Sequence, residues 1–581
     1  MILSSFKRVS YSALKIVVAV LVCLCLTLAA CPVCFAQAAG EPLTFALASD
    51  LHYNPPGESL VRISDHPVYW YANRRAAMED ESGFIIDEFL NRCAADDAIQ
   101  YVLLSGDLAD DGRFYQEDHE AVAARLRDFE ARTGKDVFVI NGNHDAADNC
   151  AATYDDFKRI YAEFGYDKAL ETMEDNCSYT ADLGESYRLI ALDSNNPKES
   201  TEDGMTAKKL SWVKRQTEQA KADGRWPILM MHHNLLDHLP LQRLLSHDFI
   251  VRFHYTTAAL FADWGIRLVM TGHEHCSDAA VYTSPAGSVI HDLATTSLTM
   301  YPLQYRVLSL TDDLIRYEAR TVDSVDTDAL TQAVKGYTED QISLMNAGLN
   351  DYAKGFLKQG VKYRLELSLS MEKMGIKETD VYYDLVNTAV GGLTGLMNMP
   401  LYGEGGAAAL AKEYNIALPE TDYQTGWDLA TELVANHYAG GEAFSVDSDE
   451  VTLLLRLAAV LLRSDLADVN DRVFLKAANA LIGNDEGVTT RLTKLCASVF
   501  GGVKPGEYFL VALLSPLLYE FAFDADGVDD NNGVFEGYGT DSALNNVNHL
   551  SLSLRLTLDR LTAYIKGFVT VLARMFIRIG T

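Results

Sequence analysis

The stretch LVMTGHEH, residues 268–275, ends an apolar run with two histidines that stand one residue apart. Neutral imidazoles are common ligands of transition metals, so His273 and His275 are candidates for a metal site. A single His-x-His pair is weak evidence, because such pairs also occur in ordinary turns. The pair gains meaning if other apolar runs of the chain also end in metal-binding side chains.

Five other apolar runs of the chain end in this way. Their polar ends are Asp50 and His52 after LTFALAS, Asp107 after YVLLSG, Asn143, His144 and Asp145 after VFVING, Asp193 after YRLIAL, and His232 and His233 after WPILMM. Each run has the length and composition of a strand buried on both faces, and helical patterns at 84–94 and 117–132 separate several of them. This alternation predicts an α/β fold. Because ligand-binding groups in such sheets gather beyond the carboxyl ends of the strands, we expect one shared site.

Taken together and in this order, the strand ends resemble the motifs of the calcineurin-like metallophosphoesterases. The matching motifs are Asp50-x-His52, Gly106-Asp107, Gly142-Asn143-His144-Asp145, His232 and Gly272-His273-x-His275. The resemblance covers about residues 43–322 and implies a calcineurin-like four-layer α/β/β/α sandwich. The sequence around the motifs, such as FGYDKALE and ATTSLTMYP, is similar to that of secreted or surface bacterial members of the family.

The resemblance implies a site with two metal ions. Asp107 would bridge the ions, Asp50, His52 and His275 would complete one position, and Asn143, His232 and His273 would complete the other. Of the neighbouring pair His232 and His233, the resemblance implies that His232 binds the metal. His233 would then face the substrate or contact a metal ligand. Asp145 and Asp193 are expected to orient ligand histidines. His144 is expected to be catalytic, by donating a hydrogen bond to the phosphoryl group or a proton to the leaving oxygen.

The residue types in these motifs suit phosphoester hydrolysis. This reaction needs a nucleophile near neutral pH and neutralisation of the phosphoryl oxygens, and two neighbouring metal ions supply both. Carboxylate and amide oxygens mixed with imidazoles suit Fe, Mn, Zn or Co. We therefore predict hydrolysis of phosphomonoesters or phosphodiesters by attack of a metal-bound hydroxide, without a covalent phosphoenzyme. The alternative is a surface binding protein that uses a phosphoesterase fold as its scaffold.

Four further features have a plainer interpretation. His119 and His238 lie near the motifs and are candidates for lining the pocket, but we favour a surface position for both. The stretch DADGVDDNNG at 524–533 lacks the spacing of an EF-hand, so we expect a solvated acidic loop. Cys150 and Cys177 either pair or stay as buried thiols, and the sequence leaves this open.

The first 38 residues are predicted to be a signal peptide. Three basic residues precede an apolar run from Ile16 to about Ala30, and FAQAAG offers a cleavage site after Ala38. The sequence LAAC, which ends at Cys31, leaves a lipoprotein signal open, and a retained N-terminal anchor is a third interpretation. All three place the folded part outside the cytoplasm, in the extracellular space or at the cell surface, with a membrane tether only through the N-terminus.

The mature chain is strongly acidic. The full sequence has a net charge of −32, and removal of the signal peptide, with three basic and no acidic residues, makes it −35. Such a charge repels a phosphate backbone, so it disfavours nucleic-acid binding as a primary role. We expect a small phosphoester substrate, and the sequence leaves the oligomeric state open.

The second half of the chain has a different pattern. From about Asp326 it becomes helical, as in EVTLLLRLAAVLLRSDL at 450–466. We expect a signal peptide at 1–38, the metallophosphoesterase domain at 39–325 and an all-α C-terminal domain of unknown role at 326–581. The segment 508–523, with Pro516 and Glu520, is too short to span a membrane. Apolar and basic residues alternate at 554–579, which predicts a docking helix, a dimer seam or a helix on a membrane surface.

Overall fold

The computed structural model describes residues 42–57, 76–198, 200–238, 242, 247–372, 375–379, 383–441, 444, 448–463 and 528–538. The predicted signal peptide, the segment 508–523 and the segment 554–579 lie outside these residues. Among the described residues, every helix is too short or too polar to cross a membrane. Cys150 and Cys177 form no disulfide.

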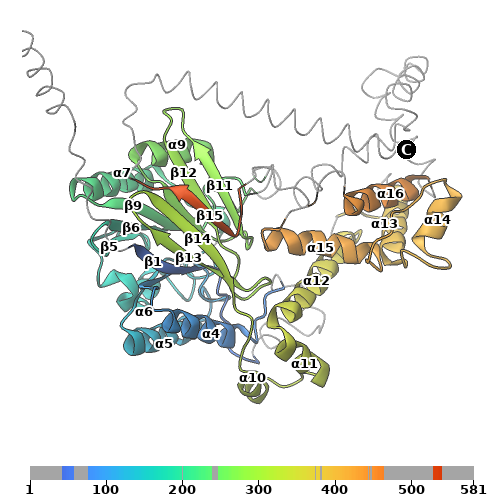
Figure 1. Cartoon of the computed structure of the whole chain (residues 1–581), viewed down its shortest axis with the longest axis horizontal. Helices are drawn as coiled ribbons and strands as arrows, with labels where there is room; N and C mark the ends of the chain where they lie inside the picture. The colour runs from blue at the N-terminus through green and yellow to red at the C-terminus, as the bar shows by residue number, and fades with distance from the viewer. Residues whose placement is uncertain are drawn as a thin grey trace, which may run out of the picture. The chain divides into compact units, whose positions relative to one another are not determined.

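The first of two central β-sheets carries the strands that precede Asp50, Asp107 and Asn143 (Figure 1). Its order is β15-β14-β13-β1-β2-β3. Its strands are β1 (Leu43–Ala48), β2 (Tyr101–Leu104), β3 (Asp136–Val139), β13 (Gln304–Leu310), β14 (Leu314–Thr321) and β15 (Asn532–Glu536). Because β1, β2 and β3 are parallel, their carboxyl ends lie at the same edge of the sheet.

The second sheet carries the strands that precede His232, His273 and His275. Its order is β11-β12-β10-β9-β6-β5-β4. Its strands are β4 (Glu171–Thr172), β5 (Tyr179–Leu183), β6 (Tyr187–Leu192), β9 (Trp226–Met231), β10 (Leu268–Thr271), β11 (Asp278–Thr283) and β12 (Val289–Ala294). β6, β9, β10 and β12 are parallel. A short hairpin of β7 (Asn195–Asn196) and β8 (Ser200–Asp203) follows β6.

Alternate residues of the inner strands belong to two different hydrophobic cores. On β9, Ile228 and Met230 pack in the core that also contains the first sheet, whereas Leu229 and Met231 pack in a core shared with helices. Successive side chains of a strand point to opposite faces, so both faces of this sheet are covered. This explains why the runs are apolar throughout and do not alternate with polar residues.

Helices cover the outer faces of the two sheets (Figure 1). The helices of the first sheet's side are α4 (Ser82–Ala95), α5 (Gln116–Thr133) and α6 (Tyr154–Ile160), followed by a π-helical turn, η1 (Ala162–Tyr166). On the second sheet lie α7 (Ala207–Ala222) and α9 (His254–Trp264). The helices predicted at 84–94 and 117–132 are confirmed as α4 and α5. The layers run helix, sheet, sheet, helix, which confirms the predicted sandwich.

The described part of 326–581 is helical, as predicted, with one exception. Its helices are α10 (Thr327–Ala333), α11 (Glu339–Ala347), α12 (Leu349–Ser368), α13 (Tyr383–Asn398), α14 (Ala407–Glu413), α15 (Gly426–Tyr438) and α16 (Asp449–Arg463). The exception is β15, which pairs antiparallel with β14 and adds an edge strand to the first sheet. Leu349 and Phe356 of α12 and Phe535 of β15 belong to the same core as the sandwich. The domain boundary at 325/326 stays a prediction.

The acidic stretch at 524–533 is not the solvated loop that we expected, as far as it is described. Asp530 is buried, and its Oδ1 accepts a hydrogen bond from the backbone N–H of Ala279 at 3.3 Å. Its carbonyl accepts a hydrogen bond from Arg306, which is also buried. The expectation was wrong because a buried arginine and the edge of the sheet bind this segment.

Candidate metal centre

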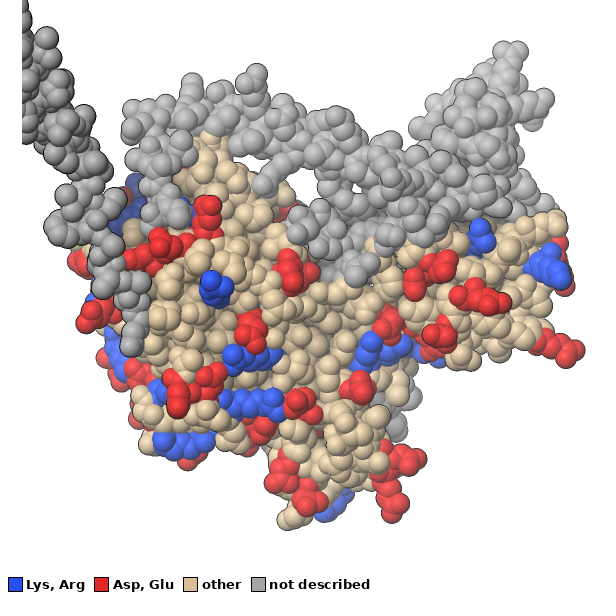
Figure 2. All heavy atoms as spheres, viewed as in Figure 1, with Lys and Arg blue, Asp and Glu red and all other residues tan. Residues whose placement is uncertain are grey.

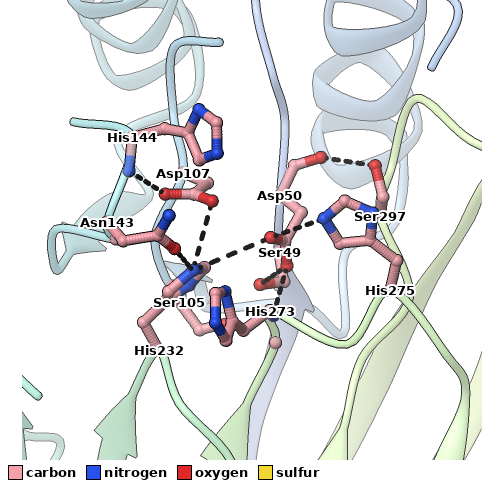
Figure 3. Close-up of polar contacts among 12 residues, drawn as sticks. Ser49, Asp50, Ser105, Asp107, Asn143, His144, His232, His273, His275 and Ser297 are labelled. Carbon is pink, nitrogen blue, oxygen red and sulfur yellow. Dashed lines mark hydrogen bonds and ion pairs between the residues drawn. The ribbon is translucent and has the colours of Figure 1, made fainter. Parts of the chain in front are cut away.

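All seven predicted metal ligands lie together where the strands end, and Figure 3 labels all of them except His52. β1 leads to Asp50 and His52, β2 to Asp107, β3 to Asn143, β9 to His232, and β10 to His273 and His275. All seven side chains are buried. His52 and His275, which are 223 residues apart in the chain, have their Nε2 atoms 3.1 Å apart.

Five of the seven residues have left-handed backbone conformations. The φ angles are 51° at Asp50, 41° at His52, 50° at Asp107, 69° at His273 and 63° at His275. This region is costly for residues other than glycine, and it persists only where the surroundings impose it. Here neighbouring glycines let the backbones pass closely. A Cβ on Gly142 would lie 2.1 Å from Asp107 Oδ1, and one on Gly272 would lie 1.8 Å from Ser49 Oγ.

The first cluster consists of Asp50, His52 and His275. Asp50 Oδ1 lies 3.2 Å from His275 Nε2 and 3.7 Å from His52 Nε2. This buried oxygen accepts no hydrogen bond from the residues that the structure describes. A buried carboxylate oxygen without a hydrogen bond, beside two imidazole nitrogens that converge on it, fits a metal-ion site.

The second cluster consists of Asp107, Asn143, His232 and His273. His232 Nε2 lies 3.2 Å from Asp107 Oδ2 and 3.1 Å from Asn143 Oδ1. His273 brings a ligand nitrogen within 4.8 Å of the ligand atoms of Asp107 and His232. The donor set is again mixed oxygen and nitrogen, so it also fits a transition-metal ion.

The two clusters form one centre. Asp50 Oδ1 of the first cluster lies 3.9 Å from His232 Nε2 of the second. Asp107 Oδ2 of the second lies 3.9 Å from His52 Nε2 of the first. Each carboxylate therefore faces imidazoles from both sides, as expected for two ions that share a bridging ligand.

Three ligand histidines present Nε2 because Nδ1 is engaged elsewhere. Nδ1 of His232 lies 3.0 Å from the Ser105 carbonyl, and Nδ1 of His52 lies 2.9 Å from Asp110 Oδ1. Nδ1 of His275 lies 3.0 Å from the thioether of Met300. Partners of this kind fix the tautomer and the orientation of a metal ligand.

Two of these partners were missed in the sequence. Asp110 had a signal, a second carboxylate three residues after Asp107 in GDLADD. Met300 had none, because a methionine after a strand is typical of an ordinary core residue.

Charges in the centre are strongly coupled. Burial alone would lower the pKa of His52 and His232, but neighbouring carboxylates raise both to about 9. Burial opposes the charged forms of Asp50 and Asp107, yet the histidines hold the pKa of each carboxyl well below its usual range. The carboxylates therefore favour a cation between them, and a metal ion must displace protons from the imidazoles to bind there.

His144 and His233 border the centre. The backbone N–H of His144 donates to Asp107 Oδ1 at 2.7 Å, and its Nδ1 lies 2.6 Å from the Asp110 carbonyl. His233 Nδ1 lies 2.9 Å from Ser194 Oγ, and its ring centroid lies 4.5 Å from that of His273. Their predicted roles, catalysis for His144 and substrate or ligand support for His233, stay predictions.

Asp145 and Asp193 bind backbone amides and do not contact a ligand histidine. Asp145 accepts hydrogen bonds from the N–H groups of Leu108, Ala109 and Gly142 at 2.7–3.1 Å. Asp193 accepts hydrogen bonds from the backbone of Cys177 and from Asn195. Asp145 thus shapes the turns that carry Asp107 and Asn143, and the histidines are oriented by other groups.

His119 and His238 are buried, so the expectation of surface histidines was wrong. His119 fills a space between Tyr161 and the Asp145 carbonyl. His238 lies between two carboxylates, 3.0 Å from Asp292 and in contact with Asp278. Burial would lower the pKa of His238, but these two carboxylates raise it to about 10. The cation therefore links the turn after β9 to β11 and β12.

Comparison with known proteins places this geometry in a family. Residues 43–277 match the model of the calcineurin-like phosphoesterases. No curated protein sequence matches the chain.

Three solved structures resemble the fold. A dimetal phosphatase from Danio rerio is 12% identical, with 48% of this chain and 97% of that chain covered and a TM-score of 0.35. Purple acid phosphatase PPD1 from yellow lupin (Lupinus luteus) is 11% identical, with 48% and 52% covered and a TM-score of 0.30. PhoD is 10% identical, with 56% and 79% covered and a TM-score of 0.32. All three are only 10–12% identical to this chain.

The family match, by contrast, spans all seven donors of the two clusters. The chain therefore contains a calcineurin-like phosphoesterase domain, and it is a metal-dependent hydrolase of phosphoesters.

Proposed function

We propose that this protein is a dinuclear-metal phosphoesterase that acts outside the cytoplasm on small phosphomonoesters or phosphodiesters. One observation carries the proposal: Asp50 Oδ1 and Asp107 Oδ2 each lie within 3.9 Å of Nε2 atoms from both clusters. Two carboxylates in this arrangement suit two ions that are close enough to act on one phosphoryl group.

The seven donors would hold Fe, Mn, Zn or Co, since hard oxygens and imidazoles prefer these ions to soft thiophilic metals. When bound, two such ions would neutralise the phosphoryl oxygens and supply a nucleophile near neutral pH. The chain itself holds the donors in place through the strained turns and through the Nδ1 partners of His52, His232 and His275.

His144 is the residue that we assign to the leaving group. It is partly exposed, whereas the seven predicted ligands are buried, so it can meet a substrate. Its Nδ1–H can donate to the Asp110 carbonyl, which leaves Nε2 for the substrate, and the imidazolium form can then give its Nε2 proton to the leaving oxygen.

The sequence supports a location outside the cytoplasm through its predicted signal peptide. The acidic charge supports a small substrate over a polyanion. On the face in Figure 2, basic side chains are interspersed among acidic ones and form no continuous basic area. Sequencing the N-terminus of the mature protein tests the location: a start at Ala39 supports secretion, and a lipidated Cys31 supports a surface lipoprotein.

The activity is tested with purified, metal-replete protein on alkyl and aryl mono- and diesters, with the metal content measured by elemental analysis. We expect close to two metals per chain and hydrolysis of at least one ester class. One metal or none would contradict the dinuclear centre. Two metals without turnover of any ester would favour the alternative, a binding protein on a phosphoesterase scaffold.

A further inference from the structure

Ser277 connects the metal centre to the C-terminal half of the chain. It stands two residues after His275 and is buried. Its backbone N–H donates to the carbonyl of Tyr438, the last residue of α15, at 3.1 Å. Its hydroxyl donates to Oδ1 of Asn531, just before β15, at 3.0 Å. We define residues 272–276 as the His-x-His turn. Two segments that are distant in the chain therefore bind Ser277, the residue that follows this turn.

Asn531 also joins the two C-terminal segments to each other. Its side-chain amide donates to the carbonyls of Ala439 at 2.9 Å and of Gly440 at 3.2 Å. One side chain thus links the end of α15, the start of β15 and Ser277.

A buried arginine braces the same point from the sheet side. Arg306 of β13 donates to Ser277 Oγ at 2.9 Å, to the Ala294 carbonyl at 2.8 Å and to the Asp530 carbonyl at 2.6 Å. A guanidinium is costly to bury, and here the acceptors of its hydrogen bonds lie in three separate parts of the chain. Removing any one of these parts leaves buried donors without acceptors.

The close approach of the C-terminal half depends on one glycine. Gly440 has φ +61°, and a Cβ on it would lie 2.5 Å from the Ser277 carbonyl oxygen and 2.7 Å from Asp530 Cβ. No side chain fits between these segments.

We propose that residues 438–440 and 529–531 position the end of the His-x-His turn, so that the C-terminal half sets the place of His275 in the first metal cluster. The inference rests on the proposed function, in which His275 binds a metal ion. Both histidines of the turn have strained left-handed backbones, which persist only while their surroundings hold them. Ser277 is where the C-terminal half supplies that hold.

The test adds a methyl group at the contact between Gly440 and Ser277. Its control adds a methyl group to another glycine with a left-handed backbone that has no neighbouring atoms. Gly440→Ala drives a Cβ against Ser277, whereas Gly405→Ala has the same kind of strain, with φ +73° and no atom within 4 Å. Asn531→Ala removes the bridge without adding atoms. Metal content is followed during titration with a chelator, and the absorption spectrum of the cobalt(II)-substituted protein reports ligand geometry.

We expect Gly440→Ala and Asn531→Ala to release one of two metals at a roughly tenfold lower chelator concentration, the usual scale for losing a partner of a ligand. Their cobalt spectra should change, and those of Gly405→Ala should match the wild type. Wild-type chelator resistance and spectra in both variants would overturn the inference.

A second pair of variants decides the question if Gly440→Ala does not fold. Ser277→Ala removes the hydroxyl and should lose metal, whereas Ser277→Thr keeps it and should retain metal. Equal retention in both would overturn the inference. Failure of the proposed function has a different signature, because the wild-type protein itself would then lack two metals or hydrolyse no ester.

Discussion

The two metal clusters are supported by different parts of the chain. In the second cluster, Nδ1 of His232 contacts the main-chain carbonyl of Ser105, and Asp145 binds the backbone turns that carry Asp107 and Asn143. In the first cluster, Nδ1 of His52 contacts the carboxylate of Asp110, and Nδ1 of His275 contacts the thioether of Met300. Ser297 also donates to the Asp50 carbonyl.

This difference indicates unequal sensitivity of the two ions. A main-chain acceptor survives every substitution of its own side chain, so the contact that orients His232 resists point mutation of Ser105. The first cluster depends on the side chains of Asp110, Ser297 and Met300 and, through Ser277, on the C-terminal half. We therefore expect the ion of the first cluster to be lost first in variants and under chelation.

The largest effect should come from Asp107→Asn. Because Asp107 faces both clusters, this variant should weaken the two metal sites together. Removing the charge between the two ions should lower the metal content below one per chain. Activity should fall to background, since several kcal/mol of charge stabilisation corresponds to roughly 10³-fold or more in rate. Elemental analysis and ester hydrolysis check this. Two retained metals would show that Asp107 does not bridge.

His144→Ala should come next, because it removes a proton donor and leaves both clusters intact. We expect a loss of roughly 10²–10⁴-fold on an alkyl phosphoester, the usual scale for a positioned acid. The loss should be smaller on a nitrophenyl ester, whose leaving group departs without a proton. Equal losses on the two esters would assign His144 to stabilising phosphoryl charge, and an unchanged rate would remove it from the mechanism.

Met300→Leu should have a smaller effect, confined to the first cluster. His275 Nδ1 loses its acceptor, so one ion should be held about tenfold more weakly, as measured by chelator titration. Met300→Gln offers an amide oxygen and should recover part of the affinity. Ser105→Ala is the matched control for the second cluster, because the carbonyl that His232 uses remains. Metal loss in Ser105→Ala would contradict the contrast between the clusters.

The smallest effect on activity should come from Glu81→Gln, at an attachment of the C-terminal half away from the clusters. Glu81 is buried and accepts hydrogen bonds from Tyr337 at 2.6 Å and Tyr352 at 3.4 Å. Burial raises the pKa of Glu81 from 4.5 to about 7. The stability that its protonated form contributes is complete below pH 4.5 and is lost as the pH rises through 7.

A glutamine stays neutral at every pH, so Glu81→Gln should be more stable than the wild type at pH 8, by about 3 kcal/mol. The difference should shrink toward pH 5. Urea unfolding of the metal-free protein at the two pH values measures it. Glu163→Gln, in an exposed ion pair with Arg127, is the control and should change stability little at either pH. A pH-independent effect of Glu81→Gln would contradict the assignment.

Much of the fold and the composition of the site were predictable from the sequence. Apolar runs marked β1, β2, β3, β6, β9 and β10, and the helical period marked α4, α5 and α16. The surroundings of His119 and His238 were not predictable, because the same residue type is found in water and in a buried network. Only the packed chain brings Tyr161 to one and two carboxylates to the other.

The sequence by itself determined which side chains follow which strands, because strand ends and glycine turns leave a local trace in residue type and spacing. Only the tertiary structure decided how these side chains are held. A carbonyl acceptor such as that of Ser105 is present in every residue and leaves no trace in the sequence. The pairing of β15 with β14 and the bonds of Asn531 to Ser277 join segments more than two hundred residues apart. Such contacts depend on how the chain packs, and no local pattern records them.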